Sequence, residues 1–402
     1  MTAIKNFFNK INNSGAKNIS LFTKWSVLQT ILACGALVVI ILKLCCGLEL
    51  VTNLSDEWPW GLWVAFDVGI LIATAAAGFT LAAIVYIFQT EKFKPLARPA
   101  ILIGTLFYTI AAIGIAVDLG RSWLIVHPLW KWNHESIMFE VGWCVMCYLT
   151  VLYLEFSHNI FEKFRLKFAE KIHHAVFMPL VFAGICFSFL HQSSLGALFL
   201  IAPQQHPLWH DPESGYMFFV SAIALGLAVL TIFSVVTAKS WKMTLRMDIL
   251  PKIGLIAAWV LLAYLAFRFF GLIHTGNISS FAFDEFGWMF LVEIVVGMVL
   301  PMTMLFIPKI RKNTAGLITA SGLVILGVGV NRFMTLIVSH AGWRHAPYFP
   351  SSTELLFTVG LICGAMLVYR IVAKYLPLYH EHYDGIPDAT QENHPEVVYE
   401  TK

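Results

Sequence analysis

The 402-residue chain carries little charge. Asp, Glu, Lys and Arg make up 13% of it, against 58% hydrophobic residues, and its mean hydropathy is +0.74. A soluble domain contains about a quarter charged residues, so this chain cannot cover a water-facing surface. Its net charge of +3 is too small to favour nucleic-acid binding. These absences predict an all-α, polytopic transmembrane helix bundle.

Cysteine is sparse and scattered. All seven cysteines fall in apolar segments, and no loop holds a cluster of them. An iron–sulfur cluster or a zinc site usually needs several such ligands at short spacings. Cys144-x-x-Cys147 is followed by Tyr148, whereas a c-type haem attachment site ends in His. The pattern predicts no iron–sulfur cluster, no c-type haem and no metal site in this chain.

Apolar runs of spanning length recur along the chain. About 20 apolar residues cross the hydrocarbon core of a bilayer as a helix. The runs predict ten helices, near residues 25–47, 61–89, 99–120, 135–157, 174–191, 215–238, 250–274, 286–307, 315–337 and 352–375. Polar segments 1–24 and 376–402 flank this membrane domain of residues 25–375, and the tail is expected to be disordered. No small-residue cleavage site follows the basic N-terminus, so the first helix should be retained.

Basic residues are divided unevenly between the two sides of the predicted bundle. Of 27 Lys and Arg residues, 21 fall in the N-terminal segment, the even-numbered connections and the C-terminal end. The other side holds six, in its loops or in helix ends: Arg121, Lys131, Arg344, Lys43, Arg268 and Arg332. Because loops rich in Lys and Arg stay in the cytoplasm, both termini are predicted to be cytoplasmic. The protein is thus expected to span the cytoplasmic membrane.

Ionisable and polar residues gather in the outer half of the predicted helices. They are Asp67, Asp118, Arg121, Glu140, His191, Gln192, Arg268, His274, Glu293 and Arg332. Charges are costly inside a bilayer and usually serve a function. The alternative is that they pair to hold the bundle, for example Asp67 or Asp118 with Arg121 or Arg332. Their concentration on one side favours a functional site.

Tryptophan is also concentrated at the outer side. Ten of the thirteen tryptophans fall there, whereas an interfacial belt should appear at both faces. The excess predicts a platform for a partner protein or for a flat aromatic ligand. The outer loops 121–134, 192–214 and 338–351 are long and carry Pro, Trp and His, as docking loops do.

None of the fourteen histidines is expected at mid-membrane. A transmembrane b-type haem usually needs axial histidines that face each other inside a bundle. The positions of the histidines therefore favour a protein without haem. A haem held near the outer surface is the alternative.

The outward position of the polar cluster bears on function. A secondary transporter or channel normally has its polar site near the midplane. A quinone entering from the bilayer needs hydrogen-bond donors for two carbonyls and then two protons, which His and carboxylates supply near neutral pH. The chain shows no redox group, so electrons would come from a partner docked outside. A transporter, a pure membrane anchor and a haem-bearing cytochrome b remain alternatives.

A set of motifs in order resembles one family of membrane subunits. Residues 59–67, Pro-Trp-Gly-Leu-Trp-Val-Ala-Phe-Asp, resemble the opening of NrfD/PsrC-type integral membrane subunits. The further motifs are Arg98-Pro99, Asp118-Leu119-Gly120-Arg121, His191-Gln192-Ser193-Ser194-Leu195-Gly196, His206-Pro207-Leu208-Trp209, Tyr348-Phe349-Pro350 and Glu354-Leu355-Leu356. Together, over roughly residues 55–375, they are most similar to the HybB-type branch, the membrane subunits of nickel–iron hydrogenases.

The resemblance implies a redox role for the chain. Electrons would pass between a periplasmic ferredoxin-like iron–sulfur subunit and menaquinone, with no haem in this chain, and would start from a hydrogenase large and small subunit pair. The quinone pocket would lie near the outer face of a bundle at about residues 61–191, beside a second bundle at about 215–337. By position, the resemblance implies Asp67 and His191 as catalytic residues. It implies these quinone-binding residues: Trp63, Asp118, Arg121, Glu140 and Gln192.

In the expected mechanism His191 and Asp67 deliver protons to the quinone, and Arg121, oriented by Asp118, holds one carbonyl. Proton uptake from the cytoplasm is a separate expectation, along a route lined by Thr74, Thr80, Tyr108, Tyr148 and Glu155.

The chain departs from the hydrogenase members in its second half, at Ile273-His274-Thr275 and at Asn331 beside Arg332. Arg268, His274 and Arg332, polar residues near the outer ends of helices in this half, are a further candidate polar site in the second bundle. A sister complex with another electron donor stays open as an alternative.

Overall fold

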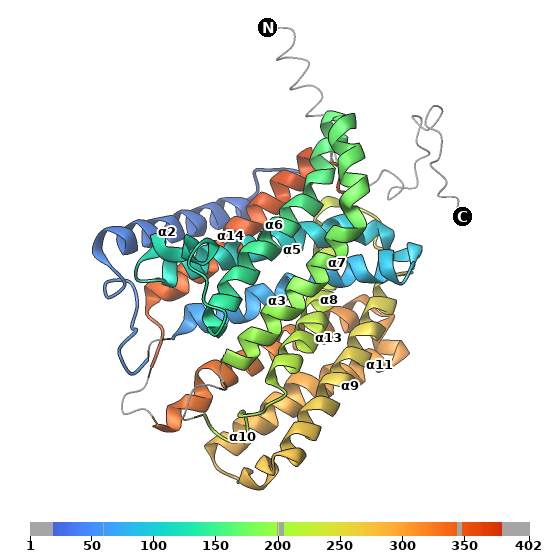
Figure 1. The fold of residues 1–402 in the computed structure, drawn as a ribbon. Helices are drawn as coiled ribbons and strands as arrows, with labels where there is room; N and C mark the ends of the chain where they lie inside the picture. The colour runs from blue at the N-terminus through green and yellow to red at the C-terminus, as the bar shows by residue number, and fades with distance from the viewer. Residues whose placement is uncertain (1–18, 59, 199, 201–204, 344–347, 380–402) are drawn as a thin grey trace.

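The computed structural model describes residues 19–58, 60–198, 200, 205–343 and 348–379. The predicted polar ends, up to residue 18 and from residue 380, lie outside these ranges, as do Pro59 and parts of the loops 192–214 and 338–351. Every regular element in the described ranges is helical, which confirms the all-α class. Ten helices there are long and apolar enough to cross a membrane, as the hydropathy pattern predicts (Figure 1).

The spans follow one another along the chain with short connections. They are α2 (Lys24–Cys46), a composite second span (Trp63–Ile87), η3 with α5 (Glu91–Asp118), α6 (Ile137–Phe164), α7 (Lys167–Leu198), α8 (Ser214–Trp241), α9 (Leu250–His274), a composite eighth span (Glu285–Phe306), α13 (Thr314–Leu336) and α14 (Ser352–Tyr375). Within the third span, α5 covers Ala97–Asp118, and the 3-10 helix η4 (Ser122–Leu129) follows it.

Two helices are longer than their apolar runs predict. α6 has 28 residues and α7 has 32, and both project past their neighbours in Figure 1. Arg165, with φ of 54°, turns the chain between them. Hydropathy marks where lipid ends, whereas a helix continues as long as its backbone groups stay hydrogen-bonded. A 32-residue helix is about 48 Å long, well beyond a hydrocarbon core of about 30 Å.

The second and eighth spans contain long π-helical segments. The second span runs through η1 (Trp63–Leu71), α3 (Ile72–Thr74), α4 (Ala76–Ala82) and η2 (Ala83–Ile87). The eighth runs through α10 (Glu285–Leu291), η7 (Val292–Val299) and α11 (Leu300–Phe306). π-Helical turns are rare and occur mostly at functional sites. Here η1 carries Asp67 and η7 carries Glu293, and both carboxylates are fully buried.

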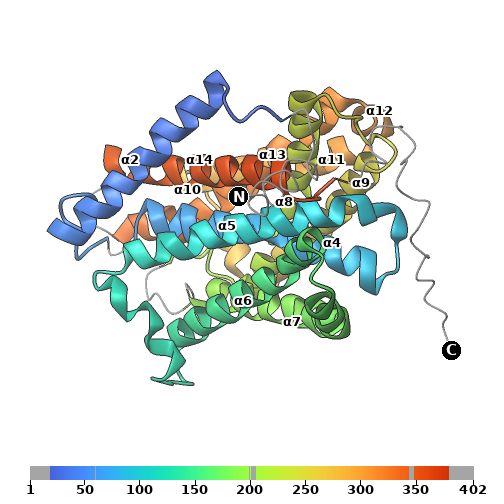
Figure 2. The same ribbon diagram turned by 90° about the horizontal axis from the view of Figure 1, so that it is seen from above.

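Helix packing places η1 in the interior. α8 lies between two groups of helices, against α4 and α7 on one side and α9 and α13 on the other. α2 runs along α14, and α14 contacts α5 and η1 (Figure 2). Small residues allow α4 and α5 to approach closely, because a Cβ on Gly104 would lie 3.0 Å from the Ala75 carbonyl oxygen. η1 is thus enclosed by α5, α13 and α14.

Candidate functional site

Asp67 is a buried carboxylate that is only partly satisfied. It lies on η1 with no exposed surface. Its Oδ2 accepts a hydrogen bond from Thr358 Oγ1 of α14 at 3.2 Å, whereas its Oδ1 has no partner. Gly114 of α5 faces it so closely that a Cβ there would lie 3.0 Å from the Asp67 Cβ. A side chain at position 114 would therefore press on the carboxylate.

His191 is the second buried polar group of this region. It lies on α7 with no exposed surface. Its Nδ1 is 3.4 Å from the hydroxyl oxygen of Tyr108 on α5, and its Nε2 has no partner. The Tyr108 ring packs edge-on against Tyr148 of α6, with centroids 4.8 Å apart. Because Tyr108 precedes Gly114 by six residues on α5, His191 lies about 9 Å deeper than Asp67 along that helix.

Several buried polar atoms in this part of the bundle lack a hydrogen-bond partner, and four of them belong to predicted site residues. These four are Asp67 Oδ1, Asp118 Oδ1, His191 Nε2 and Gln192 Oε1. They come from three neighbouring helices, η1, α5 and α7, and all belong to residues that the sequence singled out. Native proteins leave few such atoms unpaired, so a local group of them calls for a ligand or water. Acceptors and an imidazole nitrogen at two depths suit a ligand with polar groups at both ends.

The predicted contact between Asp118 and Arg121 is wrong. Arg121 is exposed, and it forms no ion pair among those found in the described chain. Instead Lys43, 3% exposed on α2, interacts electrostatically with Asp118. The backbone explains the difference, because α5 ends at Asp118 and the extended Leu119 (ψ 125°) turns the following residues toward the surface.

Trp63 and Glu140 are two further residues that the sequence predicts to bind the quinone. Trp63 is 1% exposed, donates from Nε1 to the Glu354 carbonyl at 3.2 Å, and packs on Phe357 at 4.7 Å between ring centroids. It therefore joins η1 to α14, and its N–H is already satisfied. Glu140 is exposed on the first turn of α6. The structure therefore does not bring Glu140 into the group around Asp67.

The Tyr348 and Glu354 motif holds the start of η1. The Tyr348 hydroxyl donates to Glu354 Oε1 at 2.7 Å and accepts from the Leu62 backbone N–H at 2.8 Å. Burial and the hydrogen bond to Glu354 raise the pKa of Tyr348. Glu354 Oε2 also accepts from the Asn53 backbone N–H at 3.2 Å. These contacts fix the end of the helix that carries Asp67.

A second buried polar network lies among α8, η7 and α13. Arg332 donates from Nη2 to the Phe218 carbonyl and to Ser221 Oγ, both at 2.8 Å, and from Nη1 to Asn331 Oδ1 at 3.1 Å. Both carboxylate oxygens of Glu293 are satisfied, Oε1 by Asn331 Nδ2 and Oε2 by Trp209 Nε1, each at 2.7 Å. Unlike Asp67, Glu293 has no vacant oxygen.

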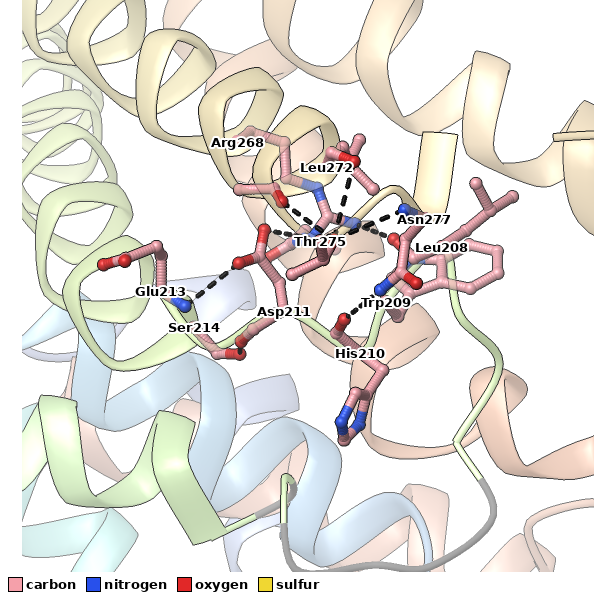
Figure 3. A network of polar contacts seen from close by, with 12 residues as sticks. Leu208, Trp209, His210, Asp211, Glu213, Ser214, Arg268, Leu272, Thr275 and Asn277 are labelled. Atoms are coloured by element: carbon pink, nitrogen blue, oxygen red, sulfur yellow. Dashed lines mark hydrogen bonds and ion pairs between the residues drawn. The ribbon is translucent and has the colours of Figure 1, made fainter. Parts of the chain in front are cut away.

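The loop before α8 closes this network at one end (Figure 3). Arg268 of α9 donates to the Leu208 carbonyl at 2.8 Å and lies 3.8 Å from Asp211 Oδ2. Asn277 Nδ2 donates to the His210 carbonyl at 2.8 Å. Burial raises the pKa of Asp211, while the Glu213 N–H and Arg268 act against that shift. The loop is thus fastened to α9 and to the segment after it.

The predicted group of Arg268, His274 and Arg332 is therefore divided. The two arginines are 2% and 0% exposed, respectively, and Tyr264 interacts electrostatically with both. His274 is exposed and stacks on Phe270 at 5.8 Å between ring centroids. Sequence reasoning missed Lys43 and Thr358 as neighbours of the candidate site, and the one signal for either was the charge of Lys43 within an apolar run.

A histidine cluster lies at the other end of α6 and α7. His158 stacks on His173 with ring centroids 5.0 Å apart, and Glu162 forms an ion pair with Arg98 at 2.7 Å. Between this cluster and Tyr148, Glu155 is 4% exposed on α6. A polar series thus extends along α6 toward His191.

Two histidine arrangements in the described part of the bundle, at His191 and at the His158 and His173 pair, do not suit a haem with two axial imidazoles. His191 faces Tyr108 in the bundle, not a second histidine. His158 and His173 face each other, but their stacked rings lie at an interplanar angle of 26° and a 5.0 Å centroid distance, which leaves no room for an iron between them. Within the described residues, no three His, Cys, Asp or Glu side chains group as metal ligands.

Comparison with known proteins shows the family to which the chain belongs. The family model described as Polysulphide reductase, NrfD matches residues 50–341. The chain belongs to the NrfD family. Together with the ten apolar helices, this makes it a multi-pass integral membrane protein.

Relatives in this family span nearly the whole chain. A relative from Nitratidesulfovibrio vulgaris, named only as a protein, is 32% identical over 380 residues, covering 91% of this chain and 97% of its own. The probable Ni/Fe-hydrogenase 2 b-type cytochrome subunit of Escherichia coli is 29% identical over 351 residues, covering 85% and 89%. The menaquinone reductase integral membrane subunit of N. vulgaris is 28% identical over 371 residues, covering 82% and 85%.

Proposed function

We propose that this chain is the quinone-reactive membrane subunit of a periplasmic-facing respiratory oxidoreductase. It takes electrons from a partner iron–sulfur subunit, itself joined to a nickel–iron hydrogenase pair, and passes them to menaquinone. The observation that carries the proposal is the pair of buried acid–base groups, Asp67 and His191, each with one unpaired polar atom. The names of the hydrogenase and menaquinone reductase relatives support both halves of it.

The orientation in the proposal follows from the basic residues. The side that holds 21 of the 27 Lys and Arg residues faces the cytoplasm, so Asp67 and His191 lie toward the periplasm. Trp123, Trp130 and Trp132, beside or within η4, are 69%, 60% and 57% exposed on that side. Large exposed aromatic residues next to the proposed site suit a docking surface for the electron-donating partner.

The chemistry assigns one proton donor to each end of the quinone ring. Reduction to the quinol takes two electrons from the partner and one proton at each carbonyl oxygen. Asp67 supplies one proton near the outer end of the bundle, and His191, about two turns deeper along α5, supplies the other. Gln192, next to His191, and Asp118 are the remaining polar contacts. The proposal does not use the exposed Arg121 or Glu140.

The protons are proposed to come from the cytoplasmic side. The route begins at the His158 and His173 cluster, passes Glu155, and reaches His191 through Tyr148 and Tyr108. Gly184 of α7 lies beside Glu155, where a Cβ would be 3.5 Å from the Glu155 Oε1, an ordinary van der Waals contact. The proposed route does not use Thr74, whose hydroxyl donates to the Ile70 carbonyl of its own helix.

The function is tested by comparing the tagged complex, purified from native membranes, with the chain alone. The complex should reduce a menaquinone analogue when its electron donor is supplied, and the chain alone should not. The identity of the co-purified donor subunit separates a hydrogenase from a sister complex. An absorption spectrum with a haem band from this chain, or ion flux through the chain alone, would contradict the proposal.

A further inference from the structure

Lys43 of α2 is a buried cation near the candidate site that the proposed mechanism does not use. α2 is the least buried of the spans and presents most of its side chains outward. Its buried positions are Ser26, Ala36, Val39 and Lys43, which lie on one face toward the rest of the molecule. A lysine on the inward face of an otherwise apolar helix is costly to place, which points to a role for it.

The contacts of Lys43 lie at the outer end of α5. Its Nζ donates to the Leu119 carbonyl at 2.6 Å and makes a further short contact with Ser122 Oγ. Leu119 directly follows α5 and Ser122 begins η4, so the ammonium group joins the two sides of this corner. A cation is also favoured at the C-terminal end of a helix, where backbone carbonyls are unpaired.

The electrostatic surroundings explain why a cation is needed there. Asp118 interacts with Glu354 and Lys43, and Asp67 interacts with Asp118. Three carboxylates therefore lie around the outer ends of η1, α5 and α14. Of these three, Asp118 is the one that interacts with the buried Lys43, whereas Arg121 is exposed.

We propose that Lys43 is a positioning residue of the quinone site. It holds the corner between α5 and η4 and offsets the charge of Asp118. This inference rests on the proposed function. It also makes α2, the first helix of the chain, part of the site that the neighbouring helices form.

The test measures menaquinone-analogue reduction by the assembled complex carrying Lys43→Met. KM for the quinone should rise about tenfold or more while kcat stays nearly constant, because hydrogen bonds that order the binding site are lost. Lys43→Arg should restore KM to within about threefold of wild type, since it keeps the charge. Lys24→Met is the matched control on the same helix, because Lys24 is exposed at the other end.

A double variant separates positioning from general stability. Removing one member of a buried charge pair leaves the other unbalanced, so Lys43→Met with Asp118→Asn should recover assembly and part of the affinity. An unchanged KM in Lys43→Met would overturn the inference, as would a rise in KM seen in Arg121→Met instead. Loss of assembly in Lys43→Met that neither Lys43→Arg nor the double variant repairs would also overturn it. An Asp67→Asn complex with the wild-type rate would reject the quinone site itself.

Discussion

Replacing Asp67 by Asn should lower quinone reduction by the assembled complex about a hundredfold or more, the usual effect of losing a general acid. Asn is nearly the same size and can still accept the hydrogen bond from Thr358. The variant therefore removes the exchangeable proton with little change in packing. The rate of donor-dependent reduction of a menaquinone analogue, per assembled complex, is the measurement.

Glu293→Gln is the matched control for this substitution. Both carboxylates are fully buried on π-helical segments, but Glu293 already has a partner at each oxygen. Its replacement should leave the reduction rate per assembled complex within a few fold of wild type. Equal losses in the two variants would show that any buried acid matters in the same way, and Asp67 would then have no special role.

Replacing Glu155 by Gln should abolish the membrane potential that turnover generates in proteoliposomes. Glu155 lies between the His158 cluster and Tyr148, where it is 4% exposed. Protons taken from the cytoplasmic side move charge across the membrane, at about 2.3 kcal/mol per charge for each 100 mV. Gln fills the same space but cannot exchange a proton, so the quinone reduction rate should also fall about tenfold or more.

The control for proton uptake is Glu91→Gln, because Glu91 is exposed at the same side of the bundle. It should leave both rate and potential unchanged. A wild-type potential in Glu155→Gln would mean that the protons follow another route. Absence of a potential in the wild-type proteoliposomes would mean that the protons come from the periplasmic side.

The spans could be predicted closely because lipid imposes a simple rule on sequence. A run such as residues 352–375 is apolar, bounded by polar residues and long enough to cross, and α14 covers that same range. The same rule misjudged α6 and α7, because α6 continues beyond its predicted range to Phe164 and α7 begins earlier, at Lys167. Hydropathy carries no information on the hydrogen-bond register, so the π-helical turns around Asp67 and Glu293 were not predicted.

Individual residues of the candidate site could be predicted only where a charged or polar side chain falls in an apolar run, because such a group is costly to bury in a membrane. Asp67, His191 and Arg332 were singled out as polar groups in apolar runs, and all three are fully buried. Their partners were not predictable, because the sequence gives neighbours along the chain, not across it. Arg121 is three residues from Asp118, yet Lys43, 75 positions earlier, is the basic residue that interacts with it.

A photoreactive menaquinone analogue, cross-linked to the purified complex and mapped by peptide mass spectrometry, tests most directly whether the quinone binds beside Asp67 and His191. Label should appear on peptides from η1, α5 and α7, and excess unmodified menaquinone should remove it. Label confined to α8, η7 and α13, around Glu293 and Arg332, would contradict this account.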